Sequence, residues 1–379
     1  MKIAIDARSA NSNTGIGRFS YNLIQEILKN DRENSYIILT NNQDSFPKIK
    51  YDNVKKIILN RKPQSQLTMF WEIFILPIYL WKEKVDVFFS PDNLIIPWFF
   101  KIKVITTIHD LIPLVLKEYR KGFKKSLKYR MRIGMLKIKN PAKIMTVSNF
   151  SKKEIHNILN ISENKIFVIK EGIDKRLKHV ESDHNILLNL GINYQYILGI
   201  GGMEKRKNNK TLIEVYIKMI QKHSDIKLDL VIVGNKESNT LPFSELEIPS
   251  SMESRIHFVG ILSSKELSVI YENAEMLVYL SLYEGFGLPP LEAMHHKISV
   301  ITSNTTSIPE VVKNAAILVN PNNKTEIENA ILKVLQDQSL KNRIISRGEK
   351  ILLEYNWKDS AKNVINEFNI LKSQIKNIK

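Results

Sequence analysis

The chain has 379 residues, of which 43% are hydrophobic, and it contains no cysteine. This length favours two globular domains over one, and the lack of cysteine excludes a disulfide framework, thiol catalysis and cysteine-ligated zinc. The formal net charge is +17, and it lies entirely in residues 1–180, which hold 33 basic and 16 acidic residues, whereas residues 181–379 hold 23 of each.

The first residues, MKIAIDAR, fit a β-strand rather than a signal peptide, because no basic segment is followed by an apolar one. We therefore expect a cytoplasmic protein. A membrane-spanning helix needs roughly 18 uninterrupted apolar residues. The most apolar window, residues 69–81, contains Glu72 and Pro77, so no transmembrane segment is expected.

Short β-branched apolar runs alternate with longer amphipathic stretches, which is the pattern of repeated βα units around a parallel sheet. A polar stretch places the domain boundary near residues 178–185. We expect Rossmann-like domains over residues 1–180 and 186–356. The predicted strands are residues 2–6, 36–40, 54–59, 85–89, 103–108, 143–147 and 166–169, then 196–200, 229–233, 256–259, 276–279, 299–302 and 316–319.

Candidate ligand-binding residues follow the predicted strands, because ligands bind at the carboxyl ends of parallel strands beside helix N-termini. Gly15 and Gly17 come after the first strand and precede a helical pattern, which suits either a phosphate or sugar contact or a plain tight turn. His109 follows the strand that ends near residue 108. It can donate to a sugar hydroxyl or a phosphate oxygen, or it can be a structural cap, with Asp110 capping the next turn or orienting the ring.

The basic charge is densest in residues 117–139, where it is interleaved with aromatic side chains such as Tyr119, Phe123 and Tyr129. This mixture suits an anionic lipid surface, a solvated lysine-rich face or nucleic acid. We expect the lipid surface. The predicted membrane-facing residues are Lys117, Arg120, Lys121, Lys124, Lys125, Lys128, Arg130 and Arg132.

In the second half, Gly201 and Gly202 follow a predicted strand, and Arg206 and Lys207 precede a helix that begins near Lys210. Backbone N–H groups, a guanidinium and an ammonium can converge there on a diphosphate. A solvated basic loop is the alternative.

Two carboxylates, Glu284 and Glu292, bracket a glycine- and proline-containing loop. The prolines suit the first turn of a helix, which would place Glu292 about one turn inside it. Both acids can then face one ligand and accept hydrogen bonds from hydroxyls rather than hold a metal. The alternative is a capping acid and a surface acid. The residues of the loop itself are Gly285, Phe286, Gly287, Leu288, Pro289, Pro290 and Leu291.

The motifs G-x-G-R, T-x-H-D, V-S-x-F-S-K, G-G-x-E-x-R-K-N and E-G-F-G-L-P-x-L-E occur in this order, and together they resemble family 4 of the retaining glycosyltransferases. The resemblance covers nearly the whole chain, including Gly172-Ile173-Asp174, residues 308–312, Trp357 and Ala361. It implies the GT-B fold, an α/β architecture of two Rossmann-like domains facing a central cleft. The C-terminal helix, residues 357–379, would cross back onto the N-terminal domain, which takes the acceptor.

The resemblance also implies an activity: transfer of a hexosyl group, with retention and without metal or cofactor, from a nucleotide-diphosphate sugar. The acceptor would be a hydroxyl of a glycan or lipid-linked oligosaccharide in surface polysaccharide or lipopolysaccharide biosynthesis. Glu284 would bind the donor sugar, Glu292 the ribose, and Arg206 and Lys207 the diphosphate. The implied catalytic residues are His109, Arg206, Lys207 and Glu284, and the implied donor-binding residues are Gly15, Gly17, Gly201, Gly202, Gly234, Gly260, Gly285, Phe286, Gly287, Leu288 and Glu292.

Other functions remain open on the sequence. A nucleotide-sugar hydrolase, epimerase or phosphorylase can use the same fold. A nucleic-acid-binding protein would fit the sequence pI of about 9.6, but the basic residues lie in no helix-turn-helix, zinc or RNP-like pattern, so no nucleic-acid partner is expected. We expect the protein to lie peripherally on the inner face of the cell membrane. The donor base, donor sugar and acceptor are not determined.

Overall fold

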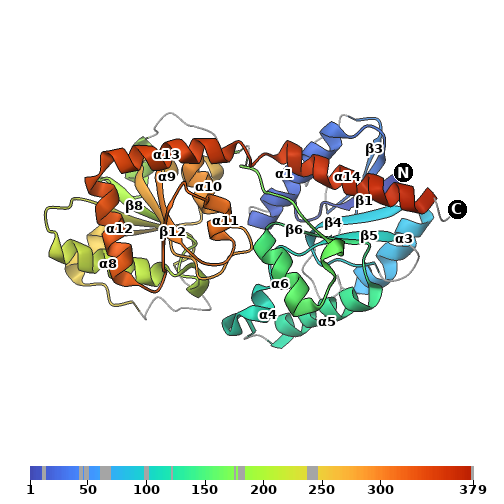
Figure 1. The fold of residues 1–379 in the computed structure, drawn as a ribbon, viewed down its shortest axis with the longest axis horizontal. Helices are drawn as coiled ribbons and strands as arrows, with labels where there is room; N and C mark the ends of the chain where they lie inside the picture. Colours follow the sequence, from blue (N-terminus) through green and yellow to red (C-terminus); the bar gives the residue numbers. More distant parts are fainter. Residues whose placement is uncertain are drawn as a thin grey trace. The chain divides into compact units, whose positions relative to one another are not determined.

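The chain forms two units, one of residues 1–174 with 356–379 and one of residues 175–355. Figure 1 shows the computed structural model, in which each unit is a sheet flanked by helices. The structure describes residues 1–10, 14–41, 46, 51–59, 70–97, 102–120, 123–174, 176–177, 184–236 and 246–376. Residues 178–183, most of the predicted boundary segment, therefore lie outside the described residues.

Unit 1 is built around a parallel sheet of seven strands in the order β3-β2-β1-β4-β5-β6-β7. In β1 the side chains of Ile3, Ala4 and Ile5 are all fully buried, as expected for a sheet covered on both faces. The carboxyl end of β1 lies between β2 and β4, near the middle of the sheet. The elements are β1 (Lys2–Asp6), α1 (Gly15–Asn30), β2 (Ser35–Thr40), β3 (Val54–Ile58), the π-helical segment η2 (Trp71–Ile75), α3 (Leu76–Lys82), β4 (Val87–Asn93), β5 (Lys103–Thr107), α4 (Ile112–Val115), η3 (Lys117–Arg120), α5 (Phe123–Lys139), β6 (Lys143–Thr146), α6 (Asn149–Leu159), η4 (Glu163–Lys165), β7 (Ile166–Val168) and α14 (Trp357–Lys376).

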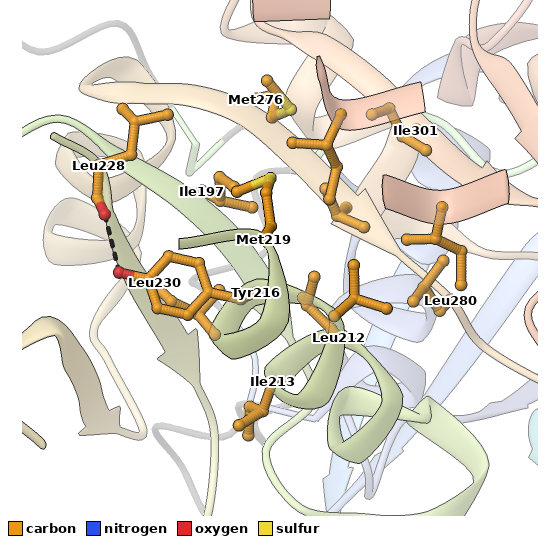
Figure 2. Packing of buried hydrophobic residues seen from close by; sticks show 14 of the residues in the cluster. Ile197, Leu212, Ile213, Tyr216, Met219, Leu228, Leu230, Met276, Leu280 and Ile301 are labelled. Carbon is orange, nitrogen blue, oxygen red and sulfur yellow. Dashed lines mark hydrogen bonds between the residues drawn. The ribbon is translucent and has the colours of Figure 1, made fainter. Parts of the chain in front are cut away.

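Unit 2 is built around a parallel sheet of six strands in the order β10-β9-β8-β11-β12-β13. Figure 2 shows part of its core, where Leu212, Tyr216 and Met219 of one helix share an apolar cluster with Ile197 of the sheet. The buried Tyr216 hydroxyl donates to the carbonyl oxygen of Leu228 at 2.7 Å, so its polar atom is satisfied. The elements are α7 (His184–Asn189), β8 (Tyr196–Ile200), η5 (Lys205–Lys207), α8 (Asn209–Lys222), β9 (Asp229–Val233), η7 (Ser250–Arg255), β10 (Ile256–Gly260), α9 (Ser264–Glu272), β11 (Ala274–Tyr279), α10 (Leu288–His295), β12 (Ser299–Ser303), α11 (Ile308–Val312), β13 (Ile317–Val319), α12 (Lys324–Gln336) and α13 (Gln338–Leu352).

The last helix, α14, belongs to unit 1, although the residues before it belong to unit 2. At its start, the Trp357 indole N–H donates to the Ile173 carbonyl oxygen at 3.0 Å, and the ring lies edge-on to Phe19 with centroids 5.5 Å apart. Further along, the Phe368 ring meets Phe89 of β4 at 5.6 Å. The predicted return of the C-terminal helix to the first domain is confirmed.

The sequence pattern predicted all thirteen strands of these two sheets, counting seven in unit 1 and six in unit 2. Boundaries differ by a few residues, most at β4, which runs over Val87–Asn93 rather than residues 85–89. The GT-B prediction of two Rossmann-like domains is confirmed. Among the described residues, no helix combines the length and apolar character needed to cross a membrane.

We expect Phe368→Ala to lower the free energy of unfolding by about 3–5 kcal/mol, because the side chain is fully buried against β4 and its loss leaves a cavity. Urea denaturation followed by circular dichroism measures the change. Ile370→Ala on the same helix is the control: Ile370 is 36% exposed, and its loss should cost less than about 1 kcal/mol. Equal effects of the two substitutions would contradict the docked position of α14.

Candidate active site

Two glycines after β8 let the chain pass close to a neighbouring loop. Gly201 and Gly202 have φ angles of 109° and 60°, which other residues rarely adopt. Both N–H groups donate to the Val233 carbonyl oxygen, at 2.8 and 2.9 Å. A Cβ atom on Gly202 would lie 2.3 Å from the backbone oxygen of Asn235, so only glycine fits there.

Two further glycines continue this close packing at the ends of the next strands. Gly234 follows β9 with a φ of 123°, and its N–H donates to the carbonyl oxygen of Gly260 at 2.8 Å. Gly260 ends β10 with a φ of 71°. Four of the predicted donor-binding glycines therefore lie at the carboxyl ends of three neighbouring strands, the edge at which parallel sheets bind ligands.

The predicted cations occupy the short helix η5, directly after the glycines. The side chain of Lys207 passes over Gly201, because a Cβ atom placed on that glycine would lie 2.5 Å from Cγ of the lysine. Arg206 donates from Nη1 to the Tyr283 carbonyl oxygen at 3.1 Å and from Nη2 to Glu204 at 3.0 Å. Both cations are thus directed toward the loop that follows β11.

That loop is fixed by hydrogen bonds from the segment before α11. Ser307 Oγ donates to the carbonyl oxygens of Glu284 and Phe286 at 3.0 and 2.8 Å, and the N–H of Glu284 donates to Thr306 Oγ1 at 3.2 Å. Gly287, with a φ of 104°, precedes α10, and a Cβ atom there would lie 2.3 Å from Ile308. A side chain at this position would be strained by the φ angle and would displace Ile308.

The other loop residues pack around this turn. Phe286 is buried, with its ring edge-on to Tyr355 at 5.9 Å, and Leu288 is the first residue of α10. Glu292 lies one turn inside α10, as predicted, and is buried, and its Oε2 accepts a hydrogen bond from the Tyr271 hydroxyl at 2.8 Å. Tyr271 in turn stacks on His296 with ring centroids 5.3 Å apart.

Glu284 joins the two loops through one oxygen atom. Its Oε1 accepts from Arg206 Nη1 at 2.6 Å and from Lys207 Nζ at 2.8 Å. The hydroxyls of Tyr279 and Ser281 also donate to it, at 2.5 and 2.7 Å. The pairing of β8 with β11 places the two loops side by side. Among the described residues, no group donates to Oε2, which leaves that oxygen for a ligand hydroxyl.

The electrostatics of this cluster follow from its burial. Burial by itself disfavours a charged Glu284, but Lys207 and Arg206 outweigh it and lower the pKa of Glu284 to about 2. Burial lowers the pKa of Lys207, an effect that the Glu284 charge opposes. Glu284 is therefore ionised near pH 7 and holds the two cations in place. Tyr279, the last residue of β11, and Ser281 were not predicted; their place at a strand end was the only signal.

Gly15 and Gly17, predicted to contact the donor, lie at the N-terminus of α1 in unit 1. The helix begins at Gly15, which is exposed, and a Cβ atom there would meet nothing within 4 Å. Thr14 caps the helix by accepting from the Gly17 N–H at 3.1 Å. The first turn is therefore open at Gly15, whereas Gly17 is buried.

His109 lies two residues beyond β5 and is buried. Its Nε2 is 3.0 Å from the Pro91 carbonyl oxygen, and its ring is edge-on to Phe19 at 4.6 Å. Burial lowers the pKa of His109 to about 4, although the carbonyl contact opposes this, so the ring is neutral at pH 7. A neutral ring that donates from Nε2 can only accept at Nδ1. In this state His109 can accept a hydrogen bond from a sugar hydroxyl, and its contact with the donor stays a prediction.

We expect the free energy of unfolding to fall as pH drops from about 6.5 to 4, because unfolded His109 takes up a proton before the folded form does. Denaturation at each pH measures this slope, and it should be shallower in His109→Gln. In ¹⁵N-detected NMR the folded His109 ring should stay neutral at pH 5.5. A ring that titrates near 6.5 would contradict the buried, neutral state.

The predicted membrane-facing residues divide into groups. Lys117 and Arg130 are exposed. Arg132 does not fit the prediction: its Nη2 lies 2.7 Å from Glu72, and only 14% of its side chain is exposed, so it faces inward. The remaining members are Arg120, Lys124, Lys125 and Lys128, which lie in η3 or α5 with undescribed side chains, and Lys121, which is outside the described residues.

Comparison with known families accounts for this arrangement of motifs. The sequence matches the model "Glycosyltransferase Family 4" over residues 13–177 and the model "Glycosyl transferases group 1" over residues 188–351. The chain belongs to the family 4 glycosyltransferases. The two family models meet near the predicted domain boundary, one on each domain.

This family 4 glycosyltransferase is 27% identical over 373 residues to the O-antigen chain mannosyltransferase B of Escherichia coli, covering 94% of this chain and 96% of that protein. Its fold matches sucrose-phosphate synthase from Thermosynechococcus elongatus with a TM-score of 0.73 at 18% identity, covering 99% and 100% of the two chains. It also matches Anabaena HepE, solved with UDP and glucose, with a TM-score of 0.71 at 15% identity, covering 97% and 99%. At these identities the two structures show the GT-B fold alone.

Proposed function

We propose that this glycosyltransferase moves a hexosyl group, with retention and without a metal, from a nucleotide-diphosphate sugar to a hydroxyl of a glycan or lipid-linked oligosaccharide. The observation that carries the proposal is the convergence of Arg206 and Lys207 on Glu284 Oε1 at 2.6 and 2.8 Å. The two cations match the negative charge of the leaving diphosphate. The carboxylate, through its second oxygen, matches the hydroxyls of the donor sugar.

Glycosyl transfer leaves negative charge on the departing diphosphate and develops positive charge at the sugar C1 atom. Arg206 and Lys207 would stabilise the leaving group, since fixed charges in a buried site lower the barrier more than they would in water. In the structure the Glu284 carboxylate pairs with both cations. A bound diphosphate would interact with the same two cations. Glu284 would therefore orient Arg206 and Lys207 while both remain able to bind the diphosphate.

The donor sugar would lie against Glu284 Oε2, to which none of the described residues donates a hydrogen bond. Its hydroxyls would donate to that oxygen. In unit 1, Nδ1 of the neutral His109 would accept a hydrogen bond from a sugar hydroxyl. We propose that Glu292 binds the ribose. The acceptor hydroxyl would attack the sugar C1 atom from the side of the leaving group, which gives retention. A phosphate oxygen of the leaving group would take the proton of that hydroxyl.

We propose a surface polysaccharide as the product, in agreement with the name of the Escherichia coli relative, and mannose as the first sugar to test. The acceptor would be presented at the inner face of the cell membrane. The basic helix α5 supports this location, since it contains seven Lys or Arg residues and no acid.

A thermal-shift screen of GDP-, UDP-, ADP- and dTDP-sugars tests the donor assignment. A donor at about 100 times its dissociation constant should stabilise the protein by about 2.7 kcal/mol. Product analysis with and without a polyprenyl-linked oligosaccharide then separates transfer from hydrolysis or epimerisation. Turnover that needs no acceptor would contradict the transferase proposal.

A further inference from the structure

Residues 70–81, which span η2 and α3, concentrate exposed apolar side chains on one helical face. The described residues include fourteen exposed large hydrophobic side chains, and five of them lie in this twelve-residue stretch. Their spacing of four, five, eight and eleven residues after the first places them on one side of a helix. We call this set the apolar strip; it consists of Phe70 (59% exposed), Phe74 (40%), Ile75 (44%), Ile78 (45%) and Trp81 (58%).

The opposite side of the same segment is apolar too. Trp71, Leu76 and Leu80 are buried and belong to a core cluster with sheet residues such as Val104. A helix that is hydrophobic all round is normally covered on every side. Here the core covers one side, and the strip on the other side faces outward, as is typical of an interaction surface.

A buried ionic network fixes this orientation. Glu72, the acid of the segment, points inward: Arg8 Nη2 lies 2.9 Å from its Oε1, and Arg132 Nη2 lies 2.7 Å from its Oε2. Arg8 is held in turn by Asp6 at 2.7 Å. Breaking such a buried pair would cost several kcal/mol. The segment is therefore held with its carboxylate inside and its aromatic residues outside.

The same network joins the strip to a basic helix. Arg132 belongs to α5, whose seventeen residues include seven Lys or Arg and no Asp or Glu. Met131 and Ile138 of α5 are also exposed, at 50% and 73%. Apolar side chains beside a basic, acid-free helix complement anionic headgroups above a hydrocarbon layer. A second copy of this chain fits less well, because two basic helices would repel each other.

We propose that the apolar strip enters the interface of an anionic bilayer while α5 faces the headgroups. This inference rests on the proposed membrane location of the acceptor and names the surface responsible. It differs from the sequence prediction, which placed the contact on residues 117–139, where basic residues are interleaved with aromatic side chains. The strip supplies apolar burial that salt does not screen, and α5 supplies attraction that salt does screen.

Flotation with vesicles of phosphatidylcholine, with and without phosphatidylglycerol, tests the surface. We expect Phe70→Ser/Trp81→Ser to bind the anionic vesicles at least about tenfold more weakly than the unchanged protein. Leu188→Ser/Leu353→Ser is the matched control, because these residues are 59% and 79% exposed but lie in unit 2, and its binding should be unchanged. Brominated lipids should quench Trp81, and Trp81→Phe should bind normally with weaker quenching.

Equal vesicle binding by the strip variant and the unchanged protein would overturn the inference. So would a dimer that the strip variant converts to a monomer, because the strip would then be a contact between copies. Nucleotide-sugar stabilisation and transfer to a soluble acceptor should be unchanged in the strip variant. A failure of the proposed function would therefore be seen in the donor-binding and transfer assays. A failure of the membrane inference would be seen only in the vesicle assay.

Discussion

We expect Lys207→Met to lower kcat by about 10²- to 10³-fold, the usual effect of removing one preorganised group that stabilises developing charge. Methionine keeps the side-chain stem that covers Gly201 and removes only the charge. Glu284 would stay paired with Arg206 at 2.6 Å, so the fold should survive. Initial rates with saturating donor measure the effect, and a melting curve checks the fold.

Lys205→Met is the matched control, because Lys205 lies in the same short helix but is exposed. Its kcat should stay within about twofold of the unchanged protein, as is usual for a surface substitution away from the chemistry. EDTA should leave the turnover of the unchanged protein intact. An unaffected Lys207→Met enzyme would contradict the leaving-group role of Lys207, and loss of turnover in EDTA would contradict metal-independent transfer.

A second large effect is expected on stability. Glu284→Gln should lower the free energy of unfolding by about 3 kcal/mol, because it leaves Lys207 and Arg206 buried with one anion fewer. Denaturant titration at pH 7 measures this. Adding Lys207→Met to Glu284→Gln should recover most of the loss, since the double variant no longer buries the unmatched ammonium.

The pH dependence gives an independent check of Glu284. Its pKa is lowered from 4.5 to about 2 in the folded protein, so its contribution to stability is complete above about pH 4.5. That contribution is lost as pH falls toward 2. The stability difference between the unchanged protein and Glu284→Gln should therefore shrink over this range. A constant difference would mean that the Glu284 carboxylate does not carry the effect.

The strand pattern and the main motifs could be predicted from the sequence, because both are local. A run such as YILGI has few alternatives to a buried strand, and glycines followed by Arg206 and Lys207 suggest an anion site wherever they occur. That Glu284 meets these cations depends on β8 pairing with β11, which local sequence does not encode. The family resemblance gave Glu284, Arg206 and Lys207 roles at the donor, but it did not predict that the carboxylate contacts the two cations directly.

Inward-facing charges were the main feature that the sequence could not reveal. Glu72 interrupts an apolar window and so argued only against a transmembrane helix, and Arg132 sits in a basic run and so suggested a surface. Their ion pair at 2.7 Å joins segments sixty residues apart, and only the tertiary fold brings them together. The neutral state of His109 could not be predicted either: its position after a strand was predicted, but its neutral state depends on burial, and its ring packs edge-on against Phe19.

The return of α14 to unit 1 also sets an order of events during synthesis. Unit 2 is continuous from residue 175 to 355, so the ribosome delivers all of it before the helix that completes unit 1. Phe19 and Phe89 are synthesised early, but their ring contacts with Trp357 and Phe368 can form only after α14 has been made. At about 5–20 residues per second this delay lasts roughly 10 to 40 s. The surface of unit 1 that packs on α14 is therefore uncovered during that time, and transiently exposed apolar surface of this kind favours aggregation.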